Sequence, residues 1–253
     1  MLETILAVKK QEIERMYLPE EADVSKYSFY QSLKQSPYTA GLIAEVKKAS
    51  PSKGIIREDF NHVMVGKQYS DAGVQAISVL TDQHFFQGHR DFLTDIKKFV
   101  DVPVMRKDFI IDPVQVAESQ LIGADAILLI GEALEAGKLH ELYLQAYEAG
   151  LEVLVEVHSE ETLEGVLKEF TPEIIGINNR NLHTFETTLE QTKQIAKLVP
   201  NDCLLVSESG IFTYDDIEQV AGYGAEAVLV GESLMRQANI KQAVSQLMKG
   251  VNV

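Results

Sequence analysis

Short apolar runs rich in Val, Ile and Leu recur eight times after residue 40, and this repeat constrains the fold more than any other feature of the sequence. The runs begin near Gly41, Ala76, Pro103, Ala126, Glu152, Ile174, Leu204 and Ala227. Successive starts are 35, 27, 23, 26, 22, 30 and 23 residues apart, which leaves room for one strand, one helix and two loops. Glycine precedes several runs, where it can end a helix in the left-handed conformation. The repeat therefore predicts eight parallel β/α units.

Eight such units close into an α/β fold, the (β/α)8 TIM barrel, and 253 residues suit one such barrel. The rival is an open doubly wound sheet, but no Gly-x-Gly-x-x-Gly follows the first strand. Residues 1–40 precede the repeat and contain two amphipathic stretches, Leu2–Met16 and Phe29–Leu33. We predict a single domain over 1–253, with 1–40 as an N-terminal helical extension that covers one end of the barrel.

The composition limits the partners of the chain. Lys and Arg number 23 against 38 Asp and Glu, a formal net charge of −15, which argues against binding to nucleic acid or to an anionic membrane. Cys203 is the only cysteine, so no internal disulfide forms, which suits a reducing compartment. Neither a secretory signal nor an apolar run of about 20 residues is present. We expect a cytoplasmic monomer.

Polar side chains follow the predicted strands at the end where barrels of this type carry their chemistry. Glu45 and Lys47 share one face at the end of the first strand, and they point into the barrel mouth if Val46 packs against the helices. Lys107 ends the third strand, Glu156 the fifth, Asn178 the sixth, and Glu208 and Ser209 the seventh. Their convergence predicts an active site that contains both ammonium and carboxylate groups.

Two loops indicate a phosphorylated substrate. Ser209-Gly210 follows the seventh strand and Gly231-Glu232 the eighth, the loops that bind phosphate in many such barrels. Glycine lets backbone N–H groups approach an anion closely. We expect the side chain of Glu232 to point away from the anion. The predicted ligand is an anionic, phosphorylated small molecule.

Other chemistries find less support in the sequence. The six histidines show no spacing typical of a metal site, and no nucleotide-binding Gly-x-x-x-x-Gly-Lys-Ser/Thr loop occurs. His158 is interpreted as a loop or supporting histidine that faces away from Glu156. Cys203 precedes the seventh strand, at the end opposite the site, and is interpreted as structural. Phe85-Phe86 is either a hydrophobic plug or a wall for an aromatic substrate.

Several segments together resemble the indole-3-glycerol-phosphate synthase family. They are Ile43–Gly54, Arg106–Ile110, Val155–His158, Gly176–Leu182, Ser207–Ile211 and Val228–Gly231. The N-terminal helices also match, so the resemblance covers essentially the whole chain, and the isomerase domain fused to some members is expected to be absent. The family converts 1-(2-carboxyphenylamino)-1-deoxyribulose 5-phosphate into indole-3-glycerol phosphate, with loss of CO2 and water. The resemblance implies a carboxy-lyase of tryptophan biosynthesis that needs no metal or organic cofactor.

The resemblance also implies roles for individual residues. Lys107 would be the principal general acid and Glu156 would transfer protons during dehydration. Further catalytic positions are Lys47, Glu45, Asn178, Ser209 and Glu208; Arg180 would bind the substrate carboxylate; Phe86, Phe109 and Leu182 would line the aromatic pocket; and Ser50, Gly210, Gly231 and Glu232 would hold phosphate. Many members carry serine at the position of Glu232.

Two alternatives remain open from the sequence. A lysine at a strand end can form an imine, so a Schiff-base aldolase acting on another sugar phosphate is one of them. A catalytically silent barrel that binds a phosphorylated metabolite or a partner enzyme is the other. The sequence also leaves open how Lys47 and Lys107 divide the acid steps.

Overall fold

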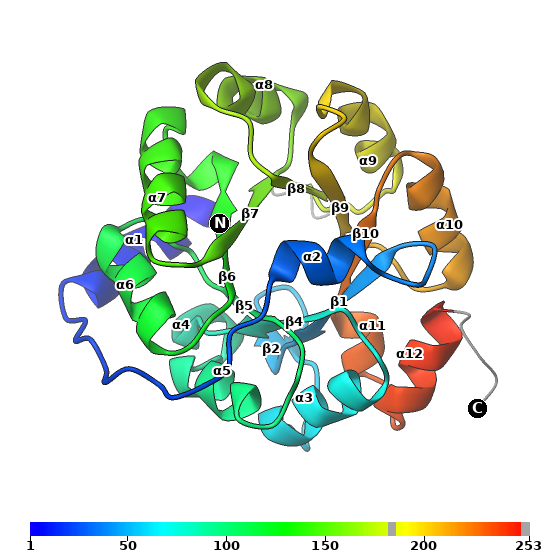
Figure 1. The fold of residues 1–253 in the computed structure, drawn as a ribbon, viewed down its shortest axis with the longest axis horizontal. Helices are drawn as coiled ribbons and strands as arrows, with labels where there is room; N and C mark the ends of the chain where they lie inside the picture. Colours follow the sequence, from blue (N-terminus) through cyan, green and yellow to red (C-terminus); the bar gives the residue numbers. More distant parts are fainter. Residues whose placement is uncertain (182–185, 249–253) are drawn as a thin grey trace.

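The computed structural model describes residues 1–181 and 186–248. Eight parallel strands close a barrel in the order β1-β4-β5-β6-β7-β8-β9-β10, and β10 returns to β1 (Figure 1). They span Gly41–Val46 (β1), Ala76–Leu80 (β4), Val104–Lys107 (β5), Ala126–Ile130 (β6), Glu152–Val157 (β7), Ile174–Asn178 (β8), Leu204–Glu208 (β9) and Ala227–Val230 (β10). The predicted (β/α)8 barrel is confirmed, and each strand begins within one residue of its predicted start.

Helices surround the barrel (Figure 1). They are α3 (His62–Asp71), α5 (Arg90–Lys97), α6 (Pro113–Leu121), α7 (Ala136–Glu148), α8 (Glu160–Glu169), α9 (Glu190–Ile195), α10 (Tyr214–Gly222) and α12 (Ile240–Met248). Several begin at side-chain caps, as at Asp112 and Thr213, where a capping box satisfies the first free N–H groups. Within the two described ranges, no helix has both the length and the apolar character needed to span a bilayer.

Shorter elements lie in the loops between strands and helices. They are α4 (Gln83–Phe86), α11 (Glu232–Met235), the 3-10 helices η1 (Gly131–Ala133) and η2 (Ala196–Leu198), and a hairpin of β2 (Ala49–Ser50) and β3 (Gly54–Ile55). The hairpin and α4 follow β1 and β4, and α11 follows β10, so all three lie at the C-terminal ends of barrel strands.

The alternation of strand side chains divides the core into two layers. On β1, Leu42, Ala44 and Val46 pack in the layer between barrel and helices, whereas Ile43 belongs to the cluster inside the barrel. Glu45 lies two residues beyond Ile43 and therefore faces the same interior. The packing of Val46 against the helices, on which the inward direction of Glu45 depended, is confirmed.

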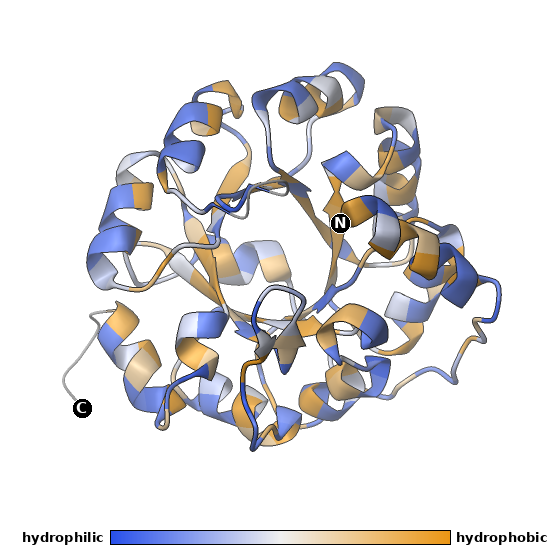
Figure 2. Ribbon diagram, turned by 180° about the vertical axis from the view of Figure 1, so that it is seen from behind, coloured by the Kyte–Doolittle hydropathy of each residue, from blue (hydrophilic) through white to orange (hydrophobic). Residues whose placement is uncertain are grey.

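The two N-terminal helices cover opposite ends of the barrel, not one end as the sequence led us to expect. In α2 (Phe29–Lys34), Phe29 and Leu33 join the interior cluster and close the N-terminal end (Figure 1). In α1 (Leu2–Ile13), Ile5 lines the cavity at the C-terminal mouth, the side seen in Figure 2. The connecting segment runs along the outside, where the Ala22 N–H donates to Leu121 O at 2.8 Å. This path carries the chain from one end to the other.

Candidate active site

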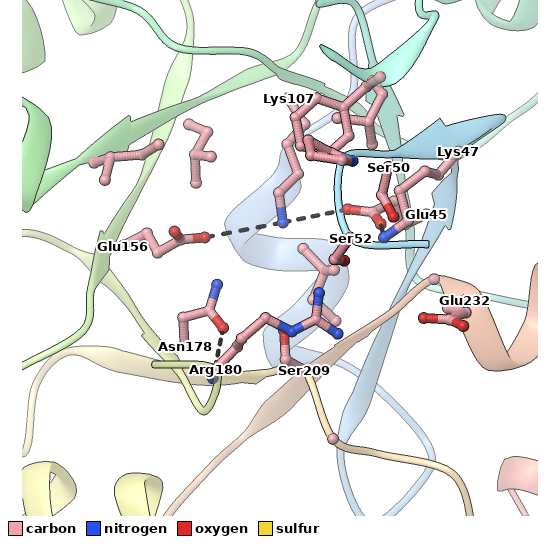
Figure 3. Close-up of a pocket in the computed structure, with 18 of the residues that line it drawn as sticks. Glu45, Lys47, Ser50, Ser52, Lys107, Glu156, Asn178, Arg180, Ser209 and Glu232 are labelled. Atoms are coloured by element: carbon pink, nitrogen blue, oxygen red, sulfur yellow. Dashed lines mark hydrogen bonds and ion pairs between the residues drawn. The ribbon is translucent and has the colours of Figure 1, made fainter. Parts of the chain in front are cut away.

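A cavity opens at the C-terminal ends of the strands and brings the predicted site residues together (Figure 3). Its lining includes Glu45, Lys47, Ser50, Phe86, Lys107, Phe109, Glu156, Asn178, Arg180, Ser209, Gly210, Gly231 and Glu232. Glu208 is fully buried beneath these residues and contacts Lys107. Leu182 lies outside the described residues. Side chains from seven loops and strand ends thus converge, although their chemical roles stay predictions.

Lys107 occupies the centre of the charged group (Figure 3). Its Nζ lies 3.0 Å from Glu208 Oε2, 3.2 Å from Glu45 Oε2 and 3.9 Å from Glu156 Oε2. Burial alone would lower the pKa of this amine, but the three surrounding glutamate side chains raise the pKa well above its ordinary value. Lys107 is therefore an ammonium at neutral pH before the reaction begins, and it has a proton to donate into the cavity.

Glu45 is a permanent carboxylate between two lysines. One of its oxygens accepts a hydrogen bond from Lys47 and the other faces Lys107. Although burial opposes ionisation, the two ammonium groups hold the pKa of Glu45 at about 2. A Cβ at Gly231 would clash with this carboxylate, so the glycine predicted for phosphate binding also leaves room for Glu45.

Glu208 differs from Glu45 in its protonation. Burial and the neighbouring Glu156 raise the pKa of Glu208 to about 8, against the opposing effect of Lys107. Glu208 Oε1 and Glu156 Oε2 are both buried, and neither oxygen accepts a hydrogen bond from another group in the described residues. A proton on Glu208 can be shared with Glu156. Gly176 of β8 makes this contact possible, since a Cβ there would overlap Glu208 Oε1.

His158 belongs to the site, contrary to the sequence interpretation. Its Nε2 lies 2.9 Å from Glu156 Oε1, and its ring lines the cavity. Burial lowers the pKa of the ring, so a neutral His158 donates its Nε2–H to Glu156. The expectation that His158 faces away was wrong because residues two apart on a strand share a face. That parity was available in the sequence.

An aromatic and aliphatic wall lies beside the charged group. The rings of Phe86 and Phe109 approach with centroids 6.2 Å apart, and both line the cavity. Of the two interpretations of Phe85-Phe86, the structure favours a cavity wall for Phe86. Leu2 and Ile5 of α1 also line the cavity. They were not predicted as site residues, because an amphipathic pattern does not reveal which end of the barrel a helix covers.

The loop after β9 has a backbone suited to an anion. Ser209 and Gly210 both adopt left-handed conformations, with φ of 67° and 79°. Such conformations are uncommon for serine and help consecutive N–H groups converge on an anion. Asn179 fixes the turn by donating to Ser209 O at 3.0 Å. After β10, Glu232 pairs with Arg236 at 2.9 Å, which neutralises its charge beside the cavity.

Arg180 and Cys203 are the remaining residues that the sequence singled out. The Arg180 N–H donates to Asn178 Oδ1 at 3.1 Å, which links the two polar residues that follow β8. Cys203 is buried just before β9, and burial raises the pKa of its thiol to about 11. In the part of the chain that the structure describes, no group of three or more His, Cys, Asp or Glu side chains could hold a metal ion.

Comparisons with known proteins identify the family of the chain. The family model described as indole-3-glycerol phosphate synthase matches residues 2–247. Proteins of that name from Priestia megaterium and Bacillus pumilus are 63% and 57% identical; each match covers 98% of this chain, and 97% and 99% of the respective relative.

Among solved structures, a thiamine phosphate pyrophosphorylase from Pyrococcus furiosus aligns with a TM-score of 0.62 at 16% identity, over 87% of this chain and 96% of that one. A 3-hexulose-6-phosphate synthase aligns with a TM-score of 0.64 at 14% identity, over 84% and 100%. These two similarities concern the fold alone. Because the family model covers almost the whole sequence and the named relatives share more than half of its residues, the chain belongs to the indole-3-glycerol phosphate synthase family.

Proposed function

We propose that the chain is a carboxy-lyase that converts 1-(2-carboxyphenylamino)-1-deoxyribulose 5-phosphate into indole-3-glycerol phosphate, CO2 and water. Family membership supports the activity. The observation that supports the mechanism is the position of Lys107, an ammonium surrounded by three glutamate side chains beside an aromatic wall. The substrate combines an aromatic ring, two kinds of anion and a ketone, and the cavity offers groups of matching chemistry to each.

Ring closure requires a proton donor at the ketone. The ring carbon that bears the carboxylate attacks the ketone carbon, and the ketone oxygen takes a proton from Lys107 to become a hydroxyl. An ammonium fixed at that oxygen stabilises the developing negative charge. Loss of CO2 then returns the bonding electrons to the ring and restores its aromaticity. Arg180, at the cavity wall, is the proposed partner of the departing carboxylate.

The overall reaction takes up one proton, and Glu208 is the proposed source. Ring closure and decarboxylation together consume that proton, whereas dehydration releases as many protons as it uses. Glu208 has a pKa raised to about 8 and lies 3.0 Å from Lys107 Nζ. It can therefore return a proton to the Lys107 amine and become a carboxylate, which regenerates the ammonium before the next step.

Dehydration needs an acid for the hydroxyl and a base for a proton on the adjacent carbon. Lys47 and Lys107 are both ammonium donors at the cavity, and Glu156 and Glu45 are the available bases. We propose Glu156 as the base, because His158 holds one of its oxygens and leaves the other directed toward Lys107. For phosphate we propose Ser50, Ser209-Gly210 and Gly231-Glu232, which line the same cavity.

A Schiff-base mechanism is less compatible with these electrostatics. Imine formation needs a neutral amine as nucleophile. The glutamate side chains around Lys107 keep it protonated, so it lacks the neutral amine that nucleophilic attack requires. Borohydride added with substrate should therefore leave no stable lysine adduct. An adduct at Lys107 or Lys47 would support the aldolase.

The direct test is turnover. Purified protein incubated with the substrate in metal-free buffer should produce the fluorescence of an indole, with one CO2 released per indole formed. Binding of the substrate without turnover would instead support a catalytically silent barrel. We further propose that the protein acts as a monomer in the cytoplasm, for which sedimentation at 28.2 kDa is the expected result in solution.

A further inference from the structure

Lys9 is a buried lysine that the proposed reaction does not use. It lies on α1 and is 3% exposed. Its Nζ lies 2.8 Å from Asp108 Oδ1, 3.0 Å from Asp82 Oδ2 and 2.6 Å from Glu12 Oε2. Asp82 and Asp108 are 0% and 4% exposed, so one ammonium from the N-terminal helix bridges two buried carboxylates in the loops after β4 and β5.

Each of these two carboxylates holds the backbone of one aromatic wall residue. Asp82 caps α4, where its Oδ1 accepts hydrogen bonds from Phe85 N at 2.7 Å and Phe86 N at 3.2 Å. Asp108 Oδ1 accepts a hydrogen bond from Phe109 N at 2.8 Å. The ammonium of Lys9 therefore contacts both of the carboxylates that hold the backbone N–H groups of Phe86 and Phe109.

The two carboxylates depend on Lys9 to different extents. Asp108 Oδ2 also accepts a hydrogen bond from Thr81 at 2.6 Å and faces Arg106 at 3.2 Å. Within the described residues, Lys9 is the one cation that forms an ion pair with Asp82. A buried carboxylate left without its counter-charge reorients, protonates or draws in water. Each of these responses disturbs the cap that orients Phe86.

The ion pairs of Lys9 also hold α1, the helix that carries two further cavity residues. α1 contributes Leu2 and Ile5 to the cavity, and Lys9 lies on this helix one turn beyond Ile5. Lys9 itself does not line the cavity as the structure describes it. Its effect on the substrate must therefore pass through Asp82, Asp108 and the helix that carries it.

We propose that Lys9 is a positioning residue that fixes the aromatic wall of the active site and thereby sets the affinity for the aromatic part of the substrate. The inference rests on the proposed function, since it assumes that an aromatic ring binds against Phe86 and Phe109. It assigns to the N-terminal helix a part in substrate selection through one buried ammonium, in addition to covering the mouth.

The test compares Lys9→Met with Lys10→Met. Met preserves the unbranched apolar stem without the charge, and Lys10 is the exposed neighbour on the same helix. For Lys9→Met we expect KM to rise about tenfold with kcat within about threefold of wild type, the pattern of lost binding rather than lost chemistry. Lys10→Met should match wild type in both constants.

Two ligands separate wall positioning from general damage. Indole-3-glycerol phosphate carries the ring and the phosphate, whereas glycerol 3-phosphate carries the phosphate alone. Lys9→Met should bind the first about tenfold more weakly and the second as wild type does. Equal weakening for both ligands, or for neither, would overturn the proposal.

A folding control keeps the test decisive. Circular dichroism and thermal unfolding of each variant are recorded first, and if Lys9→Met does not fold, Lys9→Gln replaces it because Gln retains an N–H donor. A folded Lys9→Gln with wild-type affinity for indole-3-glycerol phosphate contradicts the role of Lys9. Absence of turnover in the wild type would instead refute the proposed function, so the two failures are distinguishable.

Discussion

Two buried lysines, one at each end of the barrel, differ in the number of acidic side chains around them. Lys97 ends α5 near the N-terminal end. Its one ion pair within the described residues is with Asp125, with Nζ and Oδ2 2.6 Å apart and both side chains fully buried. Lys107 at the mouth faces three glutamates. Burial outweighs the single carboxylate and lowers the pKa of Lys97, whereas the three glutamate side chains together outweigh burial and raise the pKa of Lys107.

The two ends also differ in how completely their carboxyl oxygens are hydrogen-bonded. At the closed end, the carboxylate of Asp125 also accepts the N–H groups of Val104 at 2.7 Å and Tyr27 at 2.9 Å, so its oxygens are satisfied. At the mouth, Glu156 Oε2 and Glu208 Oε1 have no hydrogen-bond partner in the described residues. Fully satisfied polar groups stabilise one arrangement, whereas unsatisfied ones keep capacity for a ligand or a proton. The closed end thus resembles a structural site, and the mouth a reactive one.

Removal of the mouth lysine should have the largest effect on catalysis. We expect Lys107→Met to lower kcat by about 10²–10⁴, the usual loss for a positioned acid. Stability should change little, because Glu45 keeps Lys47 as a partner and Glu208 is already protonated at neutral pH. Steady-state kinetics together with urea unfolding measure both quantities. Near-normal turnover in this variant would remove Lys107 from its proposed role.

Removal of the lysine at the closed end should have the opposite effect. Lys97→Met leaves Asp125 buried without its ammonium, a change that lowers the free energy of unfolding by about 3–5 kcal/mol. Its kcat should equal that of the wild type when measured well below the unfolding temperature. The comparison between the two ends fails if Lys97→Met loses activity while it remains folded.

The protonation of Glu208 predicts a pH dependence. Its pKa rises from an ordinary 4.5 to about 8 on folding, so between these values the folded protein holds a proton that the unfolded chain has released. Stability should therefore fall as the pH rises through this window. Activity should fall above about pH 8, where Glu208 loses its proton while Lys107, with its pKa raised further, keeps its own.

The matched variant for this prediction is Glu208→Gln. Glutamine keeps the shape of the side chain but neither binds nor releases a proton. Between pH 5 and pH 8 its unfolding free energy should decline less than that of the wild type, and the alkaline limb of its pH–rate profile should disappear. Identical pH profiles for the two proteins would show that another group titrates there.

Much of the fold was predictable from the sequence because barrel strands are buried on both faces and read as continuous apolar runs. The convergence of Glu45, Lys107 and Glu156 also followed, since strand ends meet at one mouth whatever the details of packing. His158 could have been included by counting two residues from Glu156. The position of Glu208 at a strand end was predictable, but its protonation was not, because that depends on burial and on the neighbouring Glu156.

Other features depend on contacts that no local pattern encodes. The effects of Gly176 and Gly231 arise from carboxylates on other strands, Glu208 and Glu45, and so from the register between strands. The position of α1 at the mouth depends on the path of the connecting segment along the outside of the barrel. The ion pairs of Lys9 follow from that position, so the sequence alone did not reveal them.

The smallest expected effect is that of replacing His158. This variant tests whether catalysis depends on the orientation of the Glu156 carboxylate as well as on its charge. His158→Leu removes the donor to Glu156 Oε1, and a hydrogen bond to a charged group contributes about 1.5–3 kcal/mol. Part of that loss falls on stability, so we expect kcat to fall only about tenfold, as the freed carboxylate samples unproductive rotamers. His158→Asn retains an N–H donor and should recover most of the rate. Equal losses in both variants would assign the effect to packing of the ring, and the mouth would then depend on charge placement alone.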